Sequence, residues 1–517
     1  MSGDSVVART WSVVLTGLSG DLVEVEADLS TKVPGFSIIG LADKAVGEAQ
    51  QRVHNACANS ALPLSRRHVT VNLSPASLPK HGTGLDVAIA IAAVATEVPM
   101  DAGSLARTVH LGELGLDGRL RPVPGVLPAA VAAVHAGFTR MIVPHANAPE
   151  AALVAGLEVI GAVSLADVAR AHGLALPTAE LEPVPVPAPS PARDGADGSL
   201  IPELAEVIGQ RDAVDALIVA AAGGHHMLMS GPPGAGKTML ARRLPGILPA
   251  LGDADALQVA SIRSLSGLPV VRLDRVPPFE APHHSASMAA LVGGGSRIVR
   301  PGAIARASGG VLFLDEAGEF AGHALDALRQ PLEAGRIEIH RAGFSAAFPA
   351  RFQLLMATNP CPCGNYGVPG AECVCPSLSI RRYLGRLSGP LRDRIDIELA
   401  VQRVSLAQLR SAAPPVTTAA ARERVAAARE RAAHRLRDTP WRVNAEVPGA
   451  WLRSGPHAPE PTVRRPIEAA LQRGSLTLRG FDRVLRVAWS LADLAGRARL
   501  DIDDIGRALF LKKGTIA

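Results

Sequence analysis

One eight-residue segment near the middle of the chain constrains the fold more than any other. Residues 231–238 read Gly-Pro-Pro-Gly-Ala-Gly-Lys-Thr and fit the pattern G-x-x-x-x-G-K-[ST] in full. The apolar run Met227–Met229 precedes this segment, and Met239–Ala241 follows it. The loop therefore joins a strand to a helix, the setting that this motif requires. Strand and helix signals alternate from residue 200 to about 400, which predicts a parallel sheet covered by helices.

The residue types in this loop suit the phosphates of a nucleotide. Glycines let backbone amides turn toward phosphate oxygens, and the helix that follows presents its positive dipole end. Lys237 supplies a charge at the β- and γ-phosphates, and the Thr238 hydroxyl is a ligand for Mg²⁺. We therefore expect ATP and Mg²⁺ as cofactors. The expected nucleotide-binding residues are Gly231, Pro232, Pro233, Gly234, Ala235, Gly236, Lys237, Thr238 and Asp315.

Two further strands end in polar side chains. Val311–Leu314 is an apolar run followed directly by Asp315 and Glu316. In that position Asp315 can hold hydrated Mg²⁺ with Thr238, and Glu316 can polarise the attacking water. A strand ending in a solvated acidic turn is the alternative. The strand Gln353–Ala357 is followed by Thr358 and Asn359, and Asn359 is placed to contact the γ-phosphate or the water.

Length and composition divide the chain and suggest its compartment. A chain of 517 residues is too long for one core and predicts two to four domains. The net charge of +5 permits binding to a polyanion without requiring it. No apolar run reaches the ~18 residues that span a bilayer, and the N-terminus lacks the pattern of a signal peptide. We expect a cytoplasmic protein without a membrane partner.

Residues 177–199 are rich in Pro and then in Gly and Asp, which predicts a linker. The expected domains are 1–176, 200–402 and 403–517. In the first, the alternating run 22–29 and residues 69–73 and 140–143 read as strands, and 85–95 and 126–136 as helices. Two short strands are expected within 111–120. The last domain is helical, with helices at 417–437, 467–473 and 478–495, and with a Pro-rich break at 456–466.

The stretch between Lys237 and Asp315 is longer than a minimal sheet core requires. It contains His283, His284 and the Gly-rich residues 291–295, which predict an inserted loop or hairpin. The two histidines lack a third metal ligand, so we interpret them as loop residues. His340 and Arg341 lie before the strand at 353 and are candidates for contact with a DNA backbone. A plain hairpin with exposed charge is the alternative.

Four of the five cysteines fall within fifteen residues. Cys361 and Cys363 form one C-x-C pair, and Cys373 and Cys375 form another. Four thiolates can complete a tetrahedral zinc site, and a reducing cytoplasm disfavours disulfides. A structural Zn²⁺ is therefore expected, with unligated thiols as the alternative. Cys57 stands alone and is expected to be buried.

Longer blocks of sequence resemble a known family. They are PFEAPHHSASMAALVGGGS at 278–296, GVLFLDEAGEF at 310–320 and ATNPCPCGNYG at 357–367. These blocks resemble the magnesium-chelatase-like AAA+ family, and more closely its competence-associated branch of ComM and YifB type. The resemblance covers nearly the whole chain. It implies a hexameric, homo-oligomeric ATP-driven helicase that migrates branched DNA during homologous recombination and natural transformation. The expected partners are branched or single-stranded DNA and recombination proteins.

The blocks VPGFSIIGLADKAVGEAQQRV at 33–53 and VNLSPASLPKHGTGLDVAIAIAA at 71–93 resemble the N-terminal domain of the same branch. That domain is similar to the fold shared by ribosomal protein S5 and Lon protease. Proteolysis by a Ser–Lys pair is thus an alternative, but Ser77 and Lys80 lie in a Pro-flanked loop that differs from the Lon arrangement. The chain departs from the family pattern at Ala303, usually Glu, and within 306–308, which lack the usual His.

Two arginines complete the implied motor. By resemblance, Arg394 is the finger that reaches the ATP of a neighbouring subunit, with Arg392 as the alternative. A planar, permanently charged guanidinium suits phosphate oxygens. Without that role, Arg394 is expected to pair with Asp393 or Asp396.

In the C-terminal lid, Arg479 stands where the family has a second sensor of the γ-phosphate. Arg483 and Arg486 compete for the same role. The predicted catalytic set is therefore Lys237, Glu316, Asn359, Arg394 and Arg479. Two alternatives remain for the whole chain. One is a protein-remodelling or chelatase-type ATPase, and the other is a nucleotide-gated DNA-binding protein with little motor activity.

Overall fold

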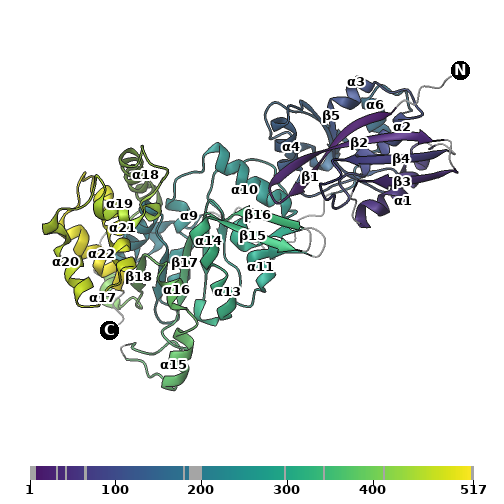
Figure 1. The fold of residues 1–517 in the computed structure, drawn as a ribbon. Helices are drawn as coiled ribbons and strands as arrows, with labels where there is room; N and C mark the ends of the chain where they lie inside the picture. The colour runs from purple at the N-terminus through teal and green to yellow at the C-terminus, as the bar shows by residue number, and fades with distance from the viewer. Residues whose placement is uncertain are drawn as a thin grey trace.

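The computed structural model describes residues 7–30, 33–40, 44–62, 64, 67–177, 181–185, 201–295, 299–341, 344–368, 370–410 and 414–513. Figure 1 shows an N-terminal α/β domain, a central α/β domain and a group of helices at the C-terminal end. Most of the predicted linker, at 178–180 and 186–199, lies outside the described residues. Within these ranges, no helix is both long and apolar enough to cross a membrane.

The N-terminal domain is built on a seven-stranded mixed sheet in the order β3-β4-β2-β1-β5-β8-β9. β1 and β2 form a long antiparallel hairpin, and β3 lies parallel to β4. The helix α2 (Asp86–Ala95) is buried from Asp86 to Val94, as its Ala-rich sequence predicts. The strands are β1 (Ala8–Thr16), β2 (Ser19–Ser30), β3 (Gly35–Ile39), β4 (His68–Ser74), β5 (Thr108–His110), β8 (Arg140–Pro144) and β9 (Glu158–Ala162).

Other predicted elements of this domain are confirmed. The helix α4 (Val126–His135) lies where 126–136 was expected, and β6 (Glu113–Leu114) pairs with β7 (Leu120–Arg121). α1 (Lys44–Asn59) carries Cys57, which is buried. Burial raises the pKa of Cys57 to about 12, so this thiol is protonated and unreactive at neutral pH.

The central domain has a five-stranded parallel sheet in the order β11-β14-β17-β10-β18. All pairings in it are parallel, so the carboxyl ends of its strands share one edge. Burial of the middle strands on both faces explains their continuous apolar sequences. The strands are β10 (Met227–Ser230), β11 (Phe279–Glu280), β14 (Val311–Leu314), β17 (Gln353–Thr358) and β18 (Ile397–Ala400).

Two insertions interrupt this domain. Between β11 and β14 lie α11 (Met288–Val292), the short pair β12 (Gly293–Gly294) and β13 (Arg300–Pro301), and α12 (Ala303–Arg306). Between β14 and β17 stands the antiparallel hairpin of β15 (Arg336–Arg341) and β16 (Phe344–Pro349). Both the predicted insert and the predicted hairpin are thus present.

The N-terminal domain packs on the central domain through α4 and α10 (Asp253–Leu265). Leu127 of α4 forms a buried apolar cluster with Ala260 and Val270. The backbone N–H of Gly125 donates to the carbonyl of Ser264 at 3.1 Å. The tip of the β1–β2 hairpin also reaches β16, where a side chain at Gly17 would collide with Ala347.

The C-terminal part is helical, with α18 (Thr418–Arg435), α19 (Gly449–Ser454), α20 (Pro461–Gln472), α21 (Leu478–Leu494) and α22 (Ile502–Lys513). The predicted start of α20 at 467 is wrong, because the helix begins at Pro461 and contains Pro466. Proline fits the first helical position, where no N–H is needed. The buried Ile467 and Ala470 then hold the helix against the lid despite the missing hydrogen bond at Pro466.

Candidate nucleotide site

The loop between β10 and α8 (Lys237–Ala241) wraps around the ammonium group of Lys237. Its Nζ donates to the carbonyls of Gly231 at 2.6 Å and Pro232 at 2.9 Å. Gly234 and Gly236 have φ angles of +75° and +90°, which only glycine adopts without strain. The loop is thus folded as a cradle with the lysine held inside it.

The acidic pair after β14 meets this loop. Thr238 Oγ1 donates to Asp315 Oδ2 at 2.6 Å, which brings together the two predicted Mg²⁺ ligands. Glu316 has a left-handed backbone, with φ at +51°. That conformation is uncommon for a residue with a side chain and often occurs at functional sites.

Asn359 completes the group from the end of β17. Its Oδ1 accepts a hydrogen bond from Lys237 Nζ at 3.0 Å. Burial lowers the pKa of Lys237, while Asp315 and Glu316 act in the opposite direction. The structure therefore brings four of the predicted residues, Lys237, Asp315, Glu316 and Asn359, to one edge of the sheet.

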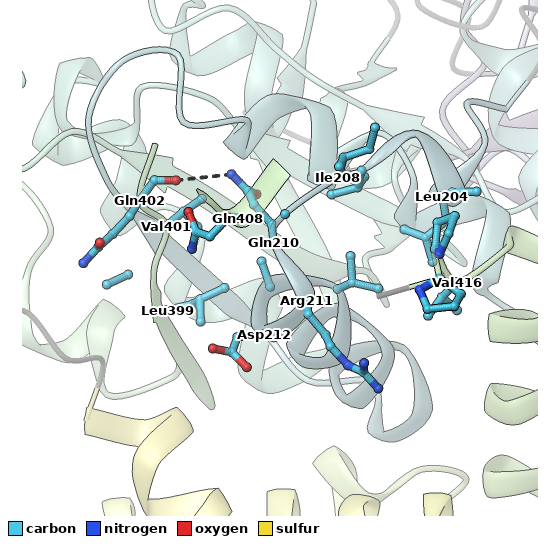
Figure 2. Close-up of a pocket in the computed structure, with 18 of the residues that line it drawn as sticks. Leu204, Ile208, Gln210, Arg211, Asp212, Leu399, Val401, Gln402, Gln408 and Val416 are labelled. Carbon is cyan, nitrogen blue, oxygen red and sulfur yellow. Dashed lines mark hydrogen bonds between the residues drawn. The ribbon is translucent and has the colours of Figure 1, made fainter. Parts of the chain in front are cut away.

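A cavity of about 920 Å³ opens beside the loop (Figure 2). Ile208, Val401 and Val416 line its apolar part. Gln210 marks its boundary with the phosphate loop, since its Nε2 donates to the carbonyl of Ala235 at 2.5 Å. A concave, mostly apolar pocket of this size next to a phosphate loop suits the base and ribose of a nucleotide.

No sequence pattern predicted this pocket. Its walls come from residues 204–214, from 398–402 and Gln408, and from 414–416 with Phe510 of the lid. These segments are far apart in the chain and carry no common spacing. The local signal was the segment Ile208-Gly209-Gln210, just before α7 (Arg211–Gly223). The role of this segment is recognisable only from the hydrogen bond between Gln210 and Ala235 in the structure.

The four clustered cysteines gather as predicted. The sulfur atoms of Cys361, Cys363, Cys373 and Cys375 all lie within 4.8 Å of one another. Cys361 Sγ is 3.4 Å from Cys363 Sγ and 3.7 Å from Cys373 Sγ. Four sulfurs at 2.3 Å from a zinc ion would be about 3.8 Å apart, so the group fits a tetrahedral site closely.

The loop that carries the four cysteines, residues 361–375, packs against the phosphate loop. A side chain at Gly364 would meet the ring of Pro233 at 2.3 Å. Hydrogen bonds from the Asn365 backbone and from Cys361 lower the pKa of Cys363 to about 6. Cys361 follows Asn359 by two residues, so an ion bound here would stiffen the loop that carries Asn359.

The two predicted arginines have partners within the chain. Arg394 pairs with Glu333 and donates to the carbonyl of Pro390 at 2.5 Å. The predicted partners Asp393 and Asp396 are therefore wrong for Arg394. Arg479 is 72% exposed and lies 3.7 Å from Asp393. Arg392, the alternative finger, pairs with Glu398 at 2.7 Å.

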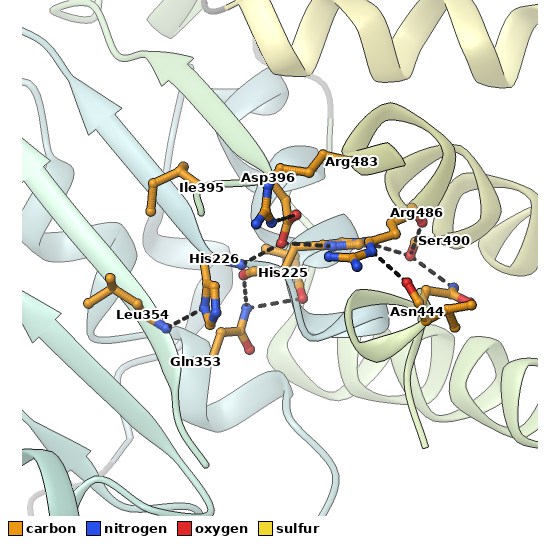
Figure 3. A network of polar contacts seen from close by, with 12 residues as sticks. His225, His226, Gln353, Leu354, Ile395, Asp396, Asn444, Arg483, Arg486 and Ser490 are labelled. Carbon is orange, nitrogen blue, oxygen red and sulfur yellow. Dashed lines mark hydrogen bonds and ion pairs between the residues drawn. The ribbon is translucent and has the colours of Figure 1, made fainter. Parts of the chain in front are cut away.

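Arg483 and Arg486 face away from the phosphate loop, in a buried network at the amino ends of β10, β17 and β18 (Figure 3). Arg483 pairs with Asp396, and Arg486 Nε donates to the carbonyl of Val447 at 2.8 Å. Burial acts to raise the pKa of Asp396, but Arg483 and His225 hold it well below its ordinary value. These arginines anchor the lid helix α21.

The network continues through two histidines. His225 Nε2 lies 2.7 Å from Ser490 Oγ of α21, and its Nδ1 lies 3.4 Å from Asp396. The backbone N–H of Leu354 donates to His226 Nδ1 at 3.0 Å. Burial lowers the pKa of His226 to about 4, so its imidazole is neutral at pH 7.

The structure confirms the predicted loop position of two further histidines and adds one contact that was not predicted. His283 and His284 lie in the loop after β11, as expected, and neither belongs to a group of three metal-ligand residues in the described chain. However, His284 Nδ1 lies 3.2 Å from Glu316 Oε2, a contact that the sequence did not suggest. His340 is on the hairpin, 3.6 Å from Glu338 and 70% exposed. The side chain of Arg341 is outside the described residues.

The Ser–Lys pair of the protease alternative does not form. Lys80 is fully buried and donates to the carbonyls of Leu73, at 3.0 Å, and Pro75. Ser77 is exposed. A lysine whose ammonium group is held by two carbonyls serves the fold of this loop, and its nitrogen is not presented to a serine hydroxyl.

Known families and relatives match this chain over nearly its whole length. The family models for magnesium chelatase subunit ChlI match residues 203–409 and 25–147, and the model of its C-terminal region matches 416–512. The competence protein ComM of Haemophilus influenzae is 39% identical over 508 residues, with 97% of each chain covered.

Two other relatives span nearly the same length. YifB of Escherichia coli is 38% identical over 489 residues, covering 92% of this chain and 91% of its own. A protein of Mycobacterium tuberculosis is 46% identical over 518 residues, covering 98% and 99%. With its S5/Lon-like N-terminal domain, parallel P-loop sheet and helical lid, the chain belongs to the magnesium-chelatase-like AAA+ ATPase family, together with ComM and YifB.

Proposed function

We propose that this protein is an ATP-hydrolysing ring motor that acts on branched DNA. The observation that carries the ATPase part is the convergence of Lys237, Thr238, Asp315, Glu316 and Asn359 at one sheet edge. The pocket beside Gln210 lies next to these groups and suits a base. The groups proposed to bind the phosphates and Mg²⁺ therefore lie next to the pocket proposed to bind the base.

Each residue has a role in this proposal. Lys237 exchanges its loop carbonyls for phosphate oxygens, and Thr238 and Asp315 hold Mg²⁺, which neutralises charge on the phosphates. Glu316 accepts a proton from the attacking water, and Asn359 orients that water or the γ-phosphate. Arg394 leaves Glu333 to reach the nucleotide of a neighbouring subunit, and Arg479 approaches the γ-phosphate as the lid closes.

The cargo part rests on different support. The relative ComM is named as a competence protein, which agrees with the action on branched DNA that the sequence resemblance implies. The β15–β16 hairpin presents the exposed His340, and the net charge of +5 is compatible with binding to a polyanion. A hexameric ring places six such hairpins around a channel.

The four cysteines form the second part of the proposal. We assign them to one structural Zn²⁺, since their sulfur separations match a tetrahedral site. The ion supplies a rigid crosslink between the Asn359 segment and the loop at 373–375. Its role is structural, because four thiolates leave no open coordination position for a water.

ATP hydrolysis in the presence of different DNA forms tests the cargo. Rates are compared with no DNA, single strands, duplex and four-way junctions, at two salt concentrations. We expect the four-way junction to stimulate most, and stimulation to fall steeply with salt because bound phosphates release counterions. An equal rate in all four conditions would favour the alternative, an ATPase that remodels a protein.

A further inference from the structure

The finger segment, residues 392–396, comes just before β18 and is bound by both of the last two long helices of the lid. From α21, Arg483 Nε donates to the carbonyl of Asp393 at 2.5 Å. From α22, Lys512 Nζ donates to the carbonyl of Ile395 at 2.8 Å. The residue between these two carbonyls is the predicted arginine finger. The lid therefore holds the backbone of the finger on both of its sides.

Lys512 can be removed with less damage to the fold than Arg483. Arg483 also neutralises the buried Asp396 (Figure 3), and its loss would leave that carboxylate uncompensated. Lys512 Nζ lies 3.4 Å from Glu398 Oε1, but Glu398 Oε2 accepts a second hydrogen bond from Arg392 at 2.7 Å. Glu398 thus keeps a cationic partner without Lys512. The main loss is then the hydrogen bond to the backbone of the finger segment.

The helix that carries Lys512 also forms part of the wall of the nucleotide pocket. Phe510, two residues earlier on α22, lines the pocket from the lid, and Glu398 and Leu399 of β18 line it from the sheet. A base held between these walls contacts the lid and the sheet at once. Filling the pocket therefore fixes α22 over the sheet, and Lys512 moves with its helix.

We propose that Lys512 is a positioning residue for Arg394. It ties the finger segment to the lid, so that a nucleotide in one subunit's own pocket sets the position of the finger that this subunit offers to its neighbour. Arg394 must leave Glu333 to reach that neighbour, and the tie fixes the backbone from which the guanidinium extends. This inference rests on the proposed function and adds a connection between adjacent sites of the ring.

Mixed assemblies separate the two subunits that meet at one site. When Lys237→Ala and Arg394→Ala proteins are combined, the working site takes its phosphate loop from the Arg394→Ala chain and its finger from the Lys237→Ala chain. Lys512→Met keeps the length of the side chain and removes the donor, and it is added to one chain or to the other. A tie to the finger matters only in the chain that donates the finger, whereas a contact that holds the lid matters equally in both.

With Lys512→Met in the finger donor, the recovered turnover at saturating ATP should fall about tenfold, the size of one charge-assisted hydrogen bond. In the chain that supplies the phosphate loop, the same change should leave the recovered turnover as it was. Lys512→Arg in the donor keeps a charged donor and should restore most of the rate. Arg507→Met is the matched control, expected to have no effect in either chain, because Arg507 lies on the same helix but pairs with Asp215 of α7 at 3.3 Å.

Equal losses with Lys512→Met in the two chains, or no loss in either, overturn the tie. Light scattering and thermal unfolding first establish that the double variants assemble and fold like their parents. If Lys512→Met does not assemble, Lys512→Gln takes its place, with the same asymmetry expected. If the mixture with an intact Lys512 shows no rescue, the finger assignment in the proposed function fails and the tie falls with it. If that mixture is rescued but the two placements give equal rates, the tie alone fails.

Discussion

The two ends of the central sheet are built from the same strands but differ in how their polar groups are satisfied. At the amino ends, His225 and Asp396 are buried and Arg483 is partly buried, and the three are paired with one another or with the lid. At the carboxyl ends, Glu316 is half exposed and its backbone is left-handed. Lys237 there is paired with carbonyls of its own loop.

This difference indicates which end is built to change partners. A buried ion pair that loses one member leaves an uncompensated charge, so the amino-end network resists rearrangement. The carboxyl-end groups are bound to atoms that a nucleotide can replace. We therefore expect substitutions at the carboxyl end to affect turnover and substitutions at the amino end to affect stability.

The largest expected effect at the carboxyl end concerns assembly. Arg394→Ala and Lys237→Ala should each be nearly inactive, since loss of an arginine finger costs on the order of 10³-fold or more in turnover. Mixed together, the two variants should regain part of the activity, because some interfaces then combine an intact loop with an intact finger. Steady-state hydrolysis after mixing measures this rescue.

Light scattering first establishes that the variants assemble and exchange subunits. Co-assembly without any rescue would mean that Arg394 acts only within its own chain, where it pairs with Glu333. Arg392 should then be tested in the same way.

At the amino end, acid should weaken the fold. The unfolded chain binds a proton on His226 below pH about 6.5, while the folded chain resists it until about pH 4. Stability is thus complete above pH 6.5 and falls as the pH drops toward 4, by up to about 3 kcal/mol. Urea unfolding at pH 7.5, 5.5 and 4.5 measures the decline.

His226→Gln is the matched variant, because its amide oxygen can still accept from Leu354. Its stability should depend less on pH over this range than that of the wild type. The remaining dependence reflects the buried His110 and His172, whose pKa values burial also lowers. If the free energy of unfolding depends on pH equally in the two proteins, His226 is not a source of the acid sensitivity.

The smallest effect concerns the cysteine site beside Asn359. Protein purified without chelators should carry about one zinc per chain, and Cys361→Ser with Cys373→Ser should carry none. Turnover should fall only several-fold, since the ion stiffens the loop without taking part in the reaction. Elemental analysis of the wild type decides, and an absence of zinc would leave four free thiols as the correct interpretation.

The sequence was sufficient for features encoded in contiguous residues. The loop at 231–238 and the pair Asp315–Glu316 carry their chemistry in local order, and parallel strands bring their ends together. The cysteines were also predictable, because their C-x-C spacing limits how the thiols can lie.

Features assembled from distant segments could not be predicted. Val416 and Ile208 meet in one pocket, and His284 meets Glu316, only because of sheet order and helix packing. The positions of the arginines on α21 could not be predicted from the sequence either. Arg479, Arg483 and Arg486 follow one another on α21, yet only the helix orientation directs Arg483 to Asp396 and leaves Arg479 exposed.

The comparison between the two ends is tested most directly by making the same chemical change at each. Glu316→Gln and Asp396→Asn both replace a carboxylate with an amide of similar shape. Glu316→Gln should bind ATP normally and unfold at the same temperature as the wild type. Its ATP hydrolysis should be about 10²- to 10⁴-fold slower. Asp396→Asn should lose about 3 kcal/mol of unfolding free energy and keep its turnover while folded. Unchanged hydrolysis in Glu316→Gln would contradict the account, because Glu316 would then not be the catalytic carboxylate.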